Sequence, residues 1–211
     1  MNWSYSCVWV VSRTFYSTYI RCRYLHPGRL PKQGPVILAA NHASFLDPPL
    51  IGAGLSRMVI FLARNTLFTV PVVGALLRSL KVVPEDREGG GGAGLKAILD
   101  RLLGGEVILL FPEGTRTPDG QLLPAKSGIG LAVIKSTAPV VPIRVFGTFE
   151  ALGRHMKFPR PRRVVVHYGE PMRFTELREE ARTCSKQRLK KIYQQVADEL
   201  MAAIGSLTQT G

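Results

Sequence analysis

The chain has 211 residues, of which 45% are hydrophobic, and this length and composition suit one folded domain with a buried core. A wholly disordered protein is therefore excluded. The 28 Lys and Arg residues exceed the 15 Asp and Glu residues, so the net charge is +13 and the pI is about 10.2. This excess predicts an anionic partner, which charge alone leaves open as lipid, nucleic acid or an acidic carrier protein.

The three cysteines, Cys7, Cys22 and Cys184, lie far apart and form no Cys-x-x-Cys pair. This spacing indicates neither a disulfide framework nor a zinc site and is typical of a reducing cytoplasm. No segment reaches the roughly 20 uninterrupted apolar residues that a membrane-spanning helix needs, so we expect no span. The N-terminus also lacks the basic start and the cleavage site of a signal peptide.

Residues 3–20 have the apolar spacing of an amphipathic helix. One face is formed by Val8, Val11, Phe15 and Tyr19 and is widened by Trp9, Tyr16 and Ile20. Two interpretations remain open. The helix packs on the core, or it docks on a membrane surface, which its Trp, Tyr and Arg side chains favour. We therefore separate an N-terminal docking segment, residues 1–25, from the main domain, residues 26–211.

The first buried strand is predicted at residues 36–40, and it ends directly on Asn41 and His42. Asp47 then has the position of a helix cap, with Pro48 in the first turn. A second strand is predicted at residues 58–63. Residues 67–77 are mostly apolar but too short to cross a bilayer, so they form either a buried helix or a partly inserted hairpin that could wall an acyl-chain tunnel.

The glycine-rich residues 89–94 lack the Gly-Lys-Ser/Thr ending of a phosphate-binding loop, so we interpret them as a connector. Strands and helices alternate in the rest of the chain. They indicate a single α/β domain with a central sheet flanked by helices. The further elements are a helix at 95–103, strands at 107–111, 140–145 and 163–168, and a closing helix at 187–204.

His42 and Asp47 are the first candidates for chemistry. A histidine can take a proton from a hydroxyl near neutral pH, and a carboxylate on its other ring nitrogen fixes the tautomer and stabilises the imidazolium. The two residues are five apart, so their contact requires a turn between strand and helix. The residues alone favour the other interpretation, in which His42 is an ordinary loop residue and Asp47 only a helix cap.

Glu113 and Arg116 are the second candidates, because they follow the strand at 107–111, a common place for site residues in α/β folds. Arg116 could bind a phosphate with two hydrogen bonds, or it could form an ion pair with Glu113 that braces the loop. The chain has no Gly-x-Ser-x-Gly elbow, since Ala125 stands two positions before Ser127. The nucleophile is therefore expected to be the hydroxyl of the substrate.

Two motifs in this order, His42-x-x-x-x-Asp47 and Phe111-Pro112-Glu113-Gly114-Thr115-Arg116, resemble those of the PlsC-type glycerolipid acyltransferases. The similarity covers residues 35–147, including Lys126-x-Gly128 and Val140-Val141-Pro142. It implies a mixed central β-sheet of the glycerol-3-phosphate acyltransferase type. It also makes residues 26–211 an acyltransferase domain, with a family-like core at about 35–147.

The resemblance implies a role for each matching residue. His42 is the general base, supported by Asp47, and the activated hydroxyl attacks a thioester, either acyl-CoA or an acylated acyl carrier protein. No metal or redox cofactor is implied. The residues expected to bind the glycerol phosphate are Glu113, Gly114, Thr115, Arg116, Arg87 and Arg64, and Pro142 is expected to contact the acyl chain or the membrane.

The expected reaction is acylation of 1-acyl-glycerol 3-phosphate to phosphatidic acid, as in phospholipid biosynthesis. Two departures from the family pattern affect the acceptor side: Thr66 replaces the glutamate of Lys-x-Glu-Leu-Phe, and Lys81 replaces a glycine. Other acceptors therefore stay open, namely glycerol 3-phosphate, a lyso-ornithine lipid or another lysophospholipid. A remote alternative is a non-catalytic basic module that binds membranes or nucleic acid.

An acid-free basic cluster suits an anionic membrane surface, an acidic carrier protein or coenzyme A. Its members are Arg154, Lys157, Arg160, Arg162 and Arg163. Binding to nucleic acid is not expected, because Phe158 is the aromatic residue within the cluster and stacking needs several. We therefore expect a peripheral protein at the cytoplasmic face of the cell membrane.

Overall fold

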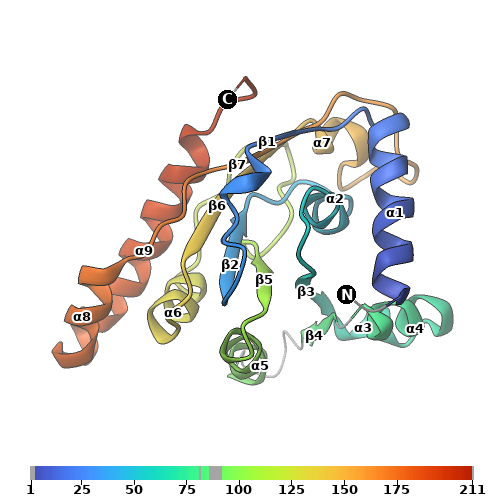
Figure 1. Ribbon diagram of the computed structural model, residues 1–211. Coiled ribbons are helices and arrows are strands. Elements are labelled where there is room, and N and C mark those ends of the chain that lie inside the picture. Colours follow the sequence, from blue (N-terminus) through green and yellow to red (C-terminus); the bar gives the residue numbers. More distant parts are fainter. Residues whose placement is uncertain (1–2, 81, 86–91, 211) are drawn as a thin grey trace.

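The central feature of the fold is a mixed sheet, ordered β1-β7-β6-β2-β5-β3-β4, between two layers of helices (Figure 1). The computed structural model describes residues 3–80, 82–85 and 92–210. This arrangement confirms the predicted α/β domain. The strands are β1 Arg23–Leu25, β2 Val36–Ala40, β3 Val59–Arg64, β4 Val83–Glu85, β5 Val107–Leu110, β6 Val140–Phe146 and β7 Val165–Tyr168.

The helices alternate with these strands along the chain. They are α1 Trp3–Thr18, the 3₁₀ turn Pro27–Arg29, α2 Asp47–Ala53, α3 Asn65–Phe68, α4 Pro71–Ser79, α5 Gly92–Leu103, α6 Gly128–Lys135, α7 Thr148–Leu152, α8 Thr175–Thr183 and α9 Lys186–Ser206. None of these described helices is both long and apolar enough to cross a membrane.

The strands β6, β2, β5, β3 and β4 run parallel, whereas β7 is antiparallel to β6 and β1 is parallel to β7. All five residues of β2 are buried, which explains its uninterrupted apolar sequence. Because parallel strands end at one edge of the sheet, the loops after β6, β2, β5 and β3 all emerge there. This edge carries the candidate site.

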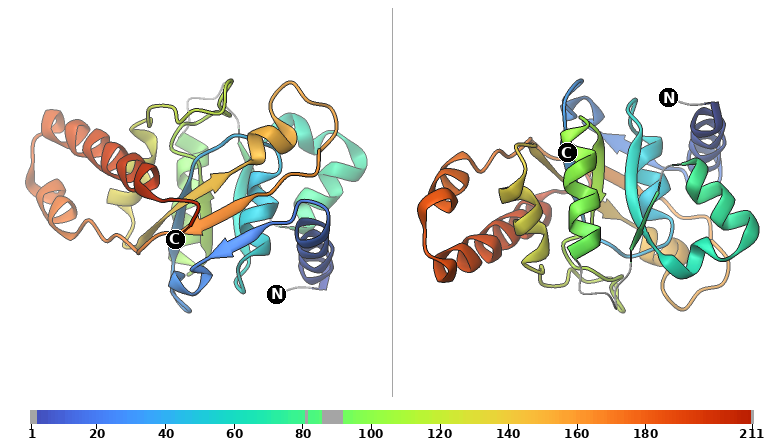
Figure 2. Two further views of the ribbon diagram at one scale, coloured as in Figure 1. Left: turned by 90° about the horizontal axis from the view of Figure 1, so that it is seen from above. Right: turned by 90° about the horizontal axis from the view of Figure 1, so that it is seen from below.

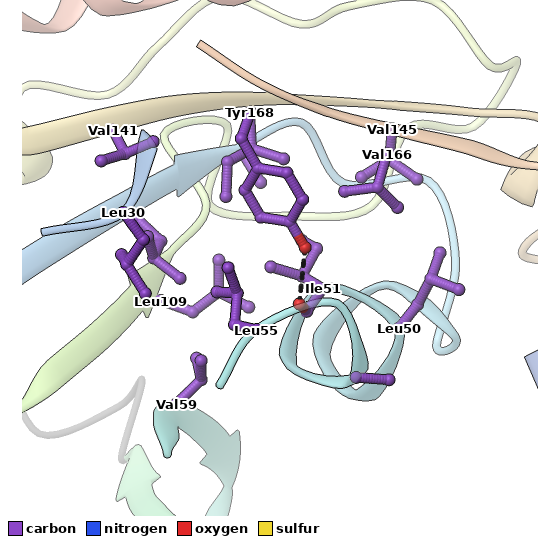
Figure 3. Close-up of a cluster of buried hydrophobic side chains, with 14 of the residues drawn as sticks. Leu30, Leu50, Ile51, Leu55, Val59, Leu109, Val141, Val145, Val166 and Tyr168 are labelled. Carbon is purple, nitrogen blue, oxygen red and sulfur yellow. Dashed lines mark hydrogen bonds between the residues drawn. The ribbon is translucent and has the colours of Figure 1, made fainter. Parts of the chain in front are cut away.

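One face of the sheet is covered by α1 and α2. Leu50 and Ile51 of α2 are fully buried against the sheet, and the hydroxyl of Tyr168 in β7 donates a 2.8 Å hydrogen bond to the Ile51 carbonyl (Figure 3). This contact fixes the helix that begins at Asp47. Tyr16 of α1 belongs to the same core cluster.

The opposite face is covered by α5, α6 and α9, whose buried residues include Ile98, Ile129 and Ile192. Both views of Figure 2 place α1 at one end of the molecule and the α8–α9 pair at the other. The helices α6 and α9 approach closely at Gly130, where a β-carbon would lie 1.9 Å from the carbonyl oxygen of Tyr193. Only glycine fits that contact.

The N-terminal segment packs through most of the predicted face, since Tyr16 and Ile20 are buried and Phe15 packs against the same core cluster. The indole nitrogen of Trp9 donates to the Leu55 carbonyl at 3.0 Å, Arg13 donates to the Ala53 carbonyl at 2.9 Å, and Tyr16 is buried. Val11, expected on the packed face, is 68% exposed. The segment assigned to residues 1–25 also includes β1, which pairs with β7.

The prediction of a buried helix at residues 67–77 was wrong. This segment contributes to two short helices, α3 and α4, with a break before Pro71. Leu67 is 37% exposed and Val70 47% exposed, so the break faces solvent. Proline has no amide hydrogen to donate, and here it occupies the first position of a helix, where none is needed.

We predict that Gly130→Ala lowers the free energy of unfolding by about 1–3 kcal/mol, because the added methyl group forces α6 away from α9. Gly128→Ala is the matched control, since a β-carbon there meets no atom within 4 Å. Urea unfolding of both variants measures the difference. Equal stability of the two would contradict this packing.

Candidate active site

The two sequence motifs meet because β2 and β5 are neighbours in the sheet. Ala39 lies opposite Leu110 in the parallel register, so the loops that begin at Asn41 and Phe111 leave the sheet side by side. On the far side of β5, β3 ends at Arg64, and on the far side of β2, β6 leads into α7. Four loops therefore surround one edge.

His42 and Asp47 form the predicted pair. His42 Nδ1 lies 2.8 Å from Asp47 Oδ2, and the same oxygen accepts hydrogen bonds from the backbone amides of Ala43 at 2.7 Å and Ser44 at 2.8 Å. The N-cap of α2 is Leu46, so the prediction of Asp47 as the cap was wrong. Its fully buried carboxylate instead reaches back and closes the turn.

The ring of His42 is held on two sides. It stacks on Phe111 with ring centroids 3.9 Å apart and an angle of 17° between the planes, and its side chain is 17% exposed. Because Nδ1 faces Asp47, the neutral ring carries its proton there and leaves the lone pair on Nε2. Nε2 can therefore accept a proton from a ligand that enters the site.

Glu113 connects the two motif loops through their backbones. Its Oε1 accepts from the amide of His42 at 2.8 Å and its Oε2 accepts from the amide of Leu123 at 3.0 Å. Burial raises the pKa of Glu113, and these two hydrogen bonds oppose the shift. The side chain is 2% exposed and, within the described part of the chain, forms no ion pair with Arg116.

Two polar residues beside His42 fix its loop to β6 and to the helix that follows it. The side-chain amide of Asn41 donates to the Val145 carbonyl at 3.0 Å and accepts from the Val145 amide at 2.7 Å. Ser44 Oγ donates to the Leu152 carbonyl at 2.8 Å. Sequence reasoning missed both contacts, because their partners lie more than 100 residues away.

Gly114 has a φ angle of +66°, a left-handed conformation that favours glycine. A β-carbon there would approach the side chain of Lys126, 3.0 Å from its Cδ. The turn thus places Lys126 over the loop and leaves Thr115 partly buried beside Arg116. The geometry of this loop therefore depends on the backbone freedom of Gly114.

Arg116 lies over the ring of Phe45, with its guanidinium carbon 3.5 Å from the ring centroid. Its Nη1 is buried and has no hydrogen-bond partner among the described residues. Burial lowers the pKa of Arg116, the charges of Arg154 and Arg64 lower it further, and Asp47 acts in the opposite direction. Neither Phe45 nor Arg154 was expected in the site.

The remaining predicted site residues do not all lie at this edge of the sheet. Arg64 stands at the end of β3, close enough to influence Arg116 electrostatically, whereas Arg87 lies outside the described residues. Pro142 is buried within β6, where its ring lies against Gly169, so it does not reach the protein surface. Its expected contact with the acyl chain stays a prediction. In the part of the chain that the structure describes, no group of His, Cys, Asp or Glu is placed to hold a metal.

An apolar cavity of about 50 Å³ lies beside this site, between α1 and α2. Its lining includes Trp9 from α1, Pro48 and Pro49 from the start of α2, and Phe61 from β3. Pro48 directly follows Asp47 in the sequence, so the cavity begins next to the catalytic candidates.

A family model described as Acyltransferase matches residues 21–146. The chain is 34% identical over 116 residues to 1-acyl-sn-glycerol-3-phosphate acyltransferase BAT2, chloroplastic, of Brassica napus, covering 54% of this chain and 33% of that protein. It is 28% identical over 161 residues to the 1-acyl-sn-glycerol-3-phosphate acyltransferase of Bacillus subtilis, covering 76% of each. The chain thus spans about a third of the plant relative's length.

Its fold is similar to the crystal structure of the 1-acyl-sn-glycerophosphate acyltransferase PlsC from Thermotoga maritima. The TM-score is 0.71 with 25% sequence identity, and the match covers 96% of this chain and 82% of that one. The family match and the fold agree with the two motifs that the structure brings to one sheet edge. The chain belongs to the PlsC-type acyltransferase family.

Proposed function

We propose that this protein transfers an acyl chain from a thioester to the free hydroxyl of 1-acyl-glycerol 3-phosphate, producing phosphatidic acid. The observation that carries this proposal is the pairing of His42 Nδ1 with Asp47 Oδ2 at 2.8 Å, which leaves Nε2 available beside an arginine whose Nη1 has no partner in the described chain. One group activates a hydroxyl, and the other binds an anion on the same molecule.

The reaction needs one proton transfer and one acyl transfer. His42 Nε2 takes the proton of the acceptor hydroxyl as its oxygen attacks the thioester carbonyl, and Asp47 stabilises the imidazolium that forms. The tetrahedral intermediate collapses, the carbon–sulfur bond breaks, and the imidazolium returns the proton to the thiolate. The products are an ester and a free thiol, either coenzyme A or acyl carrier protein.

The substrates fit the charge and the apolar surface of the site. We assign the acceptor phosphate to Arg116, because guanidinium groups bind phosphate through two hydrogen bonds. The apolar cavity between Trp9 and Pro48 is assigned to the start of an acyl chain. Both thioester donors are anionic, so the net charge of +13 attracts either one.

His42→Ala is expected to lower the acyl-transfer rate by roughly 10²–10⁴-fold while the protein stays folded, because a general base contributes about that factor. Asp47→Asn should lower the rate by at least about a hundredfold, since the amide oxygen still accepts a hydrogen bond from Nδ1–H but carries no charge to stabilise the imidazolium. Acyl transfer to lysophosphatidate, measured with acyl-CoA and with acyl carrier protein, tests both. Full activity of His42→Ala would favour the non-catalytic alternative.

Glu113→Gln distinguishes bracing from substrate binding. Both carboxylate oxygens accept a backbone amide, and an amide side chain can satisfy one of them, so we expect a loss of about 1–3 kcal/mol in the free energy of unfolding. Glu179→Gln on α8 is the control, because its side chain is exposed. A Glu113→Gln variant of unchanged stability with a raised KM would assign Glu113 to the substrate instead.

We also propose that the outer side of α1 docks on an anionic membrane. This side exposes Trp3 by 82%, Val10 by 54% and Val11 by 68%, whereas the inner side is bound to α2. Exposed aromatic and aliphatic side chains on a basic protein are typical of interfacial helices. The two interpretations of this helix thus apply to its two sides.

Replacing Trp3, Val10 and Val11 together by serine should weaken sedimentation with anionic vesicles by at least about tenfold, because their apolar surface no longer enters the lipid. The melting temperature should stay the same, since none of the three is buried. Leu103→Ser, which removes an 87% exposed side chain from α5 on the other face of the sheet, is the control. Equal vesicle binding by both variants would exclude docking through α1.

A further inference from the structure

Arg154 lies at the same sheet edge as His42, Arg116 and Arg64, although it belongs to none of the motifs. It follows α7, the helix after β6, and β6 is the parallel neighbour of β2. The hydrogen bond from Ser44 Oγ to the Leu152 carbonyl, 2.8 Å long, holds the chain two residues before Arg154 against the loop of His42. Strand order and this bond therefore fix its position.

The positive charges of three guanidinium groups at this edge are not balanced by ion pairs within the described residues. Arg64, Arg116 and Arg154 form no ion pair or hydrogen bond through their side chains within the described residues, and Arg116 Nη1 is buried without a partner. Burial is the largest cause that lowers the pKa of Arg116, the charge of Arg154 is the second and the charge of Arg64 is the third. Asp47, the opposing charge, already accepts three hydrogen bonds.

Arg154 is also separate from other members of the basic cluster in which the sequence places it. Arg162 and Arg163 line a shallow polar pocket with Glu150 and Gln209, where a carboxylate lies near them. The charge of Arg154 instead acts on Arg116, as does the charge of Arg64. Like charges are brought together at a cost that an anionic ligand removes.

We propose that Arg154 is the third guanidinium of a phosphate site formed with Arg116 and Arg64, and that it makes the site selective for a phosphomonoester. The inference rests on the proposed function and specifies its acceptor class. A phosphomonoester carries about −1.5 to −2 charges at pH 7. Three guanidinium groups match this charge better than they match a phosphodiester or a phosphate-free lyso-ornithine lipid.

The test compares Arg154→Gln and Arg154→Lys with Arg182→Gln, which removes the same charge from an exposed site on α8. We expect Arg154→Gln to lower kcat/KM for lysophosphatidate about tenfold, mainly through KM, because one charge-assisted hydrogen bond is lost. Arg154→Lys should restore part of this loss. Transfer to a lyso-ornithine lipid in the same vesicles, and transfer by Arg182→Gln, should not change.

Unchanged kinetics of Arg154→Gln on lysophosphatidate, or an equal loss on the lyso-ornithine lipid, would overturn this proposal and leave the general reaction intact. If the unaltered protein transfers no acyl chain to lysophosphatidate, the proposed function fails. Calorimetric binding of glycerol 3-phosphate then tests the phosphate site by itself. Weaker binding by Arg154→Gln than by Arg182→Gln would then support the phosphate site. Equal binding, or none by the unaltered protein, would overturn it.

Discussion

The buried carboxylate oxygen Oδ2 of Asp47 holds the turn on which the site depends. It accepts one hydrogen bond from the His42 ring and two from consecutive backbone amides. Burying a carboxylate without such partners would cost free energy, so the three donors stabilise the charge and the charge holds the donors in place. The same contacts that stabilise the turn set the tautomer of His42, and structure and proposed chemistry therefore share one interaction.

A second buried carboxylate, Glu113, joins this turn to the loop after β5. It binds the amide of His42 from one side, while the Thr117 amide donates to the His42 carbonyl at 2.8 Å. Asn41 and Ser44 tie the turn to β6 and α7 in the same way. All of these contacts join parts of the chain to one another, and they bring the loops that carry Arg116 and Arg154 to the edge where His42 lies.

The sequence patterns failed where partners outside the segment decided the structure. Helical spacing predicted most of the packed side of α1, but it missed the hydrogen bond from Arg13 to the Ala53 carbonyl and placed the exposed Val11 on that side. Pro142 followed the family pattern, but the central position of β6 buries it. The break at Pro71 left residues 67–77 too short for one buried helix.

The sequence by itself determined the buried strands, the order of the two motifs and the pair His42 and Asp47, because these depend on local apolar runs and on short spacings. It also determined Arg116 as a residue at a strand end. Only the tertiary structure decided what surrounds them: Glu113 on the His42 backbone, Phe45 under Arg116, and Arg154 close enough for its charge to act on Arg116. These contacts follow from strand order, which brings together residues that local sequence cannot relate.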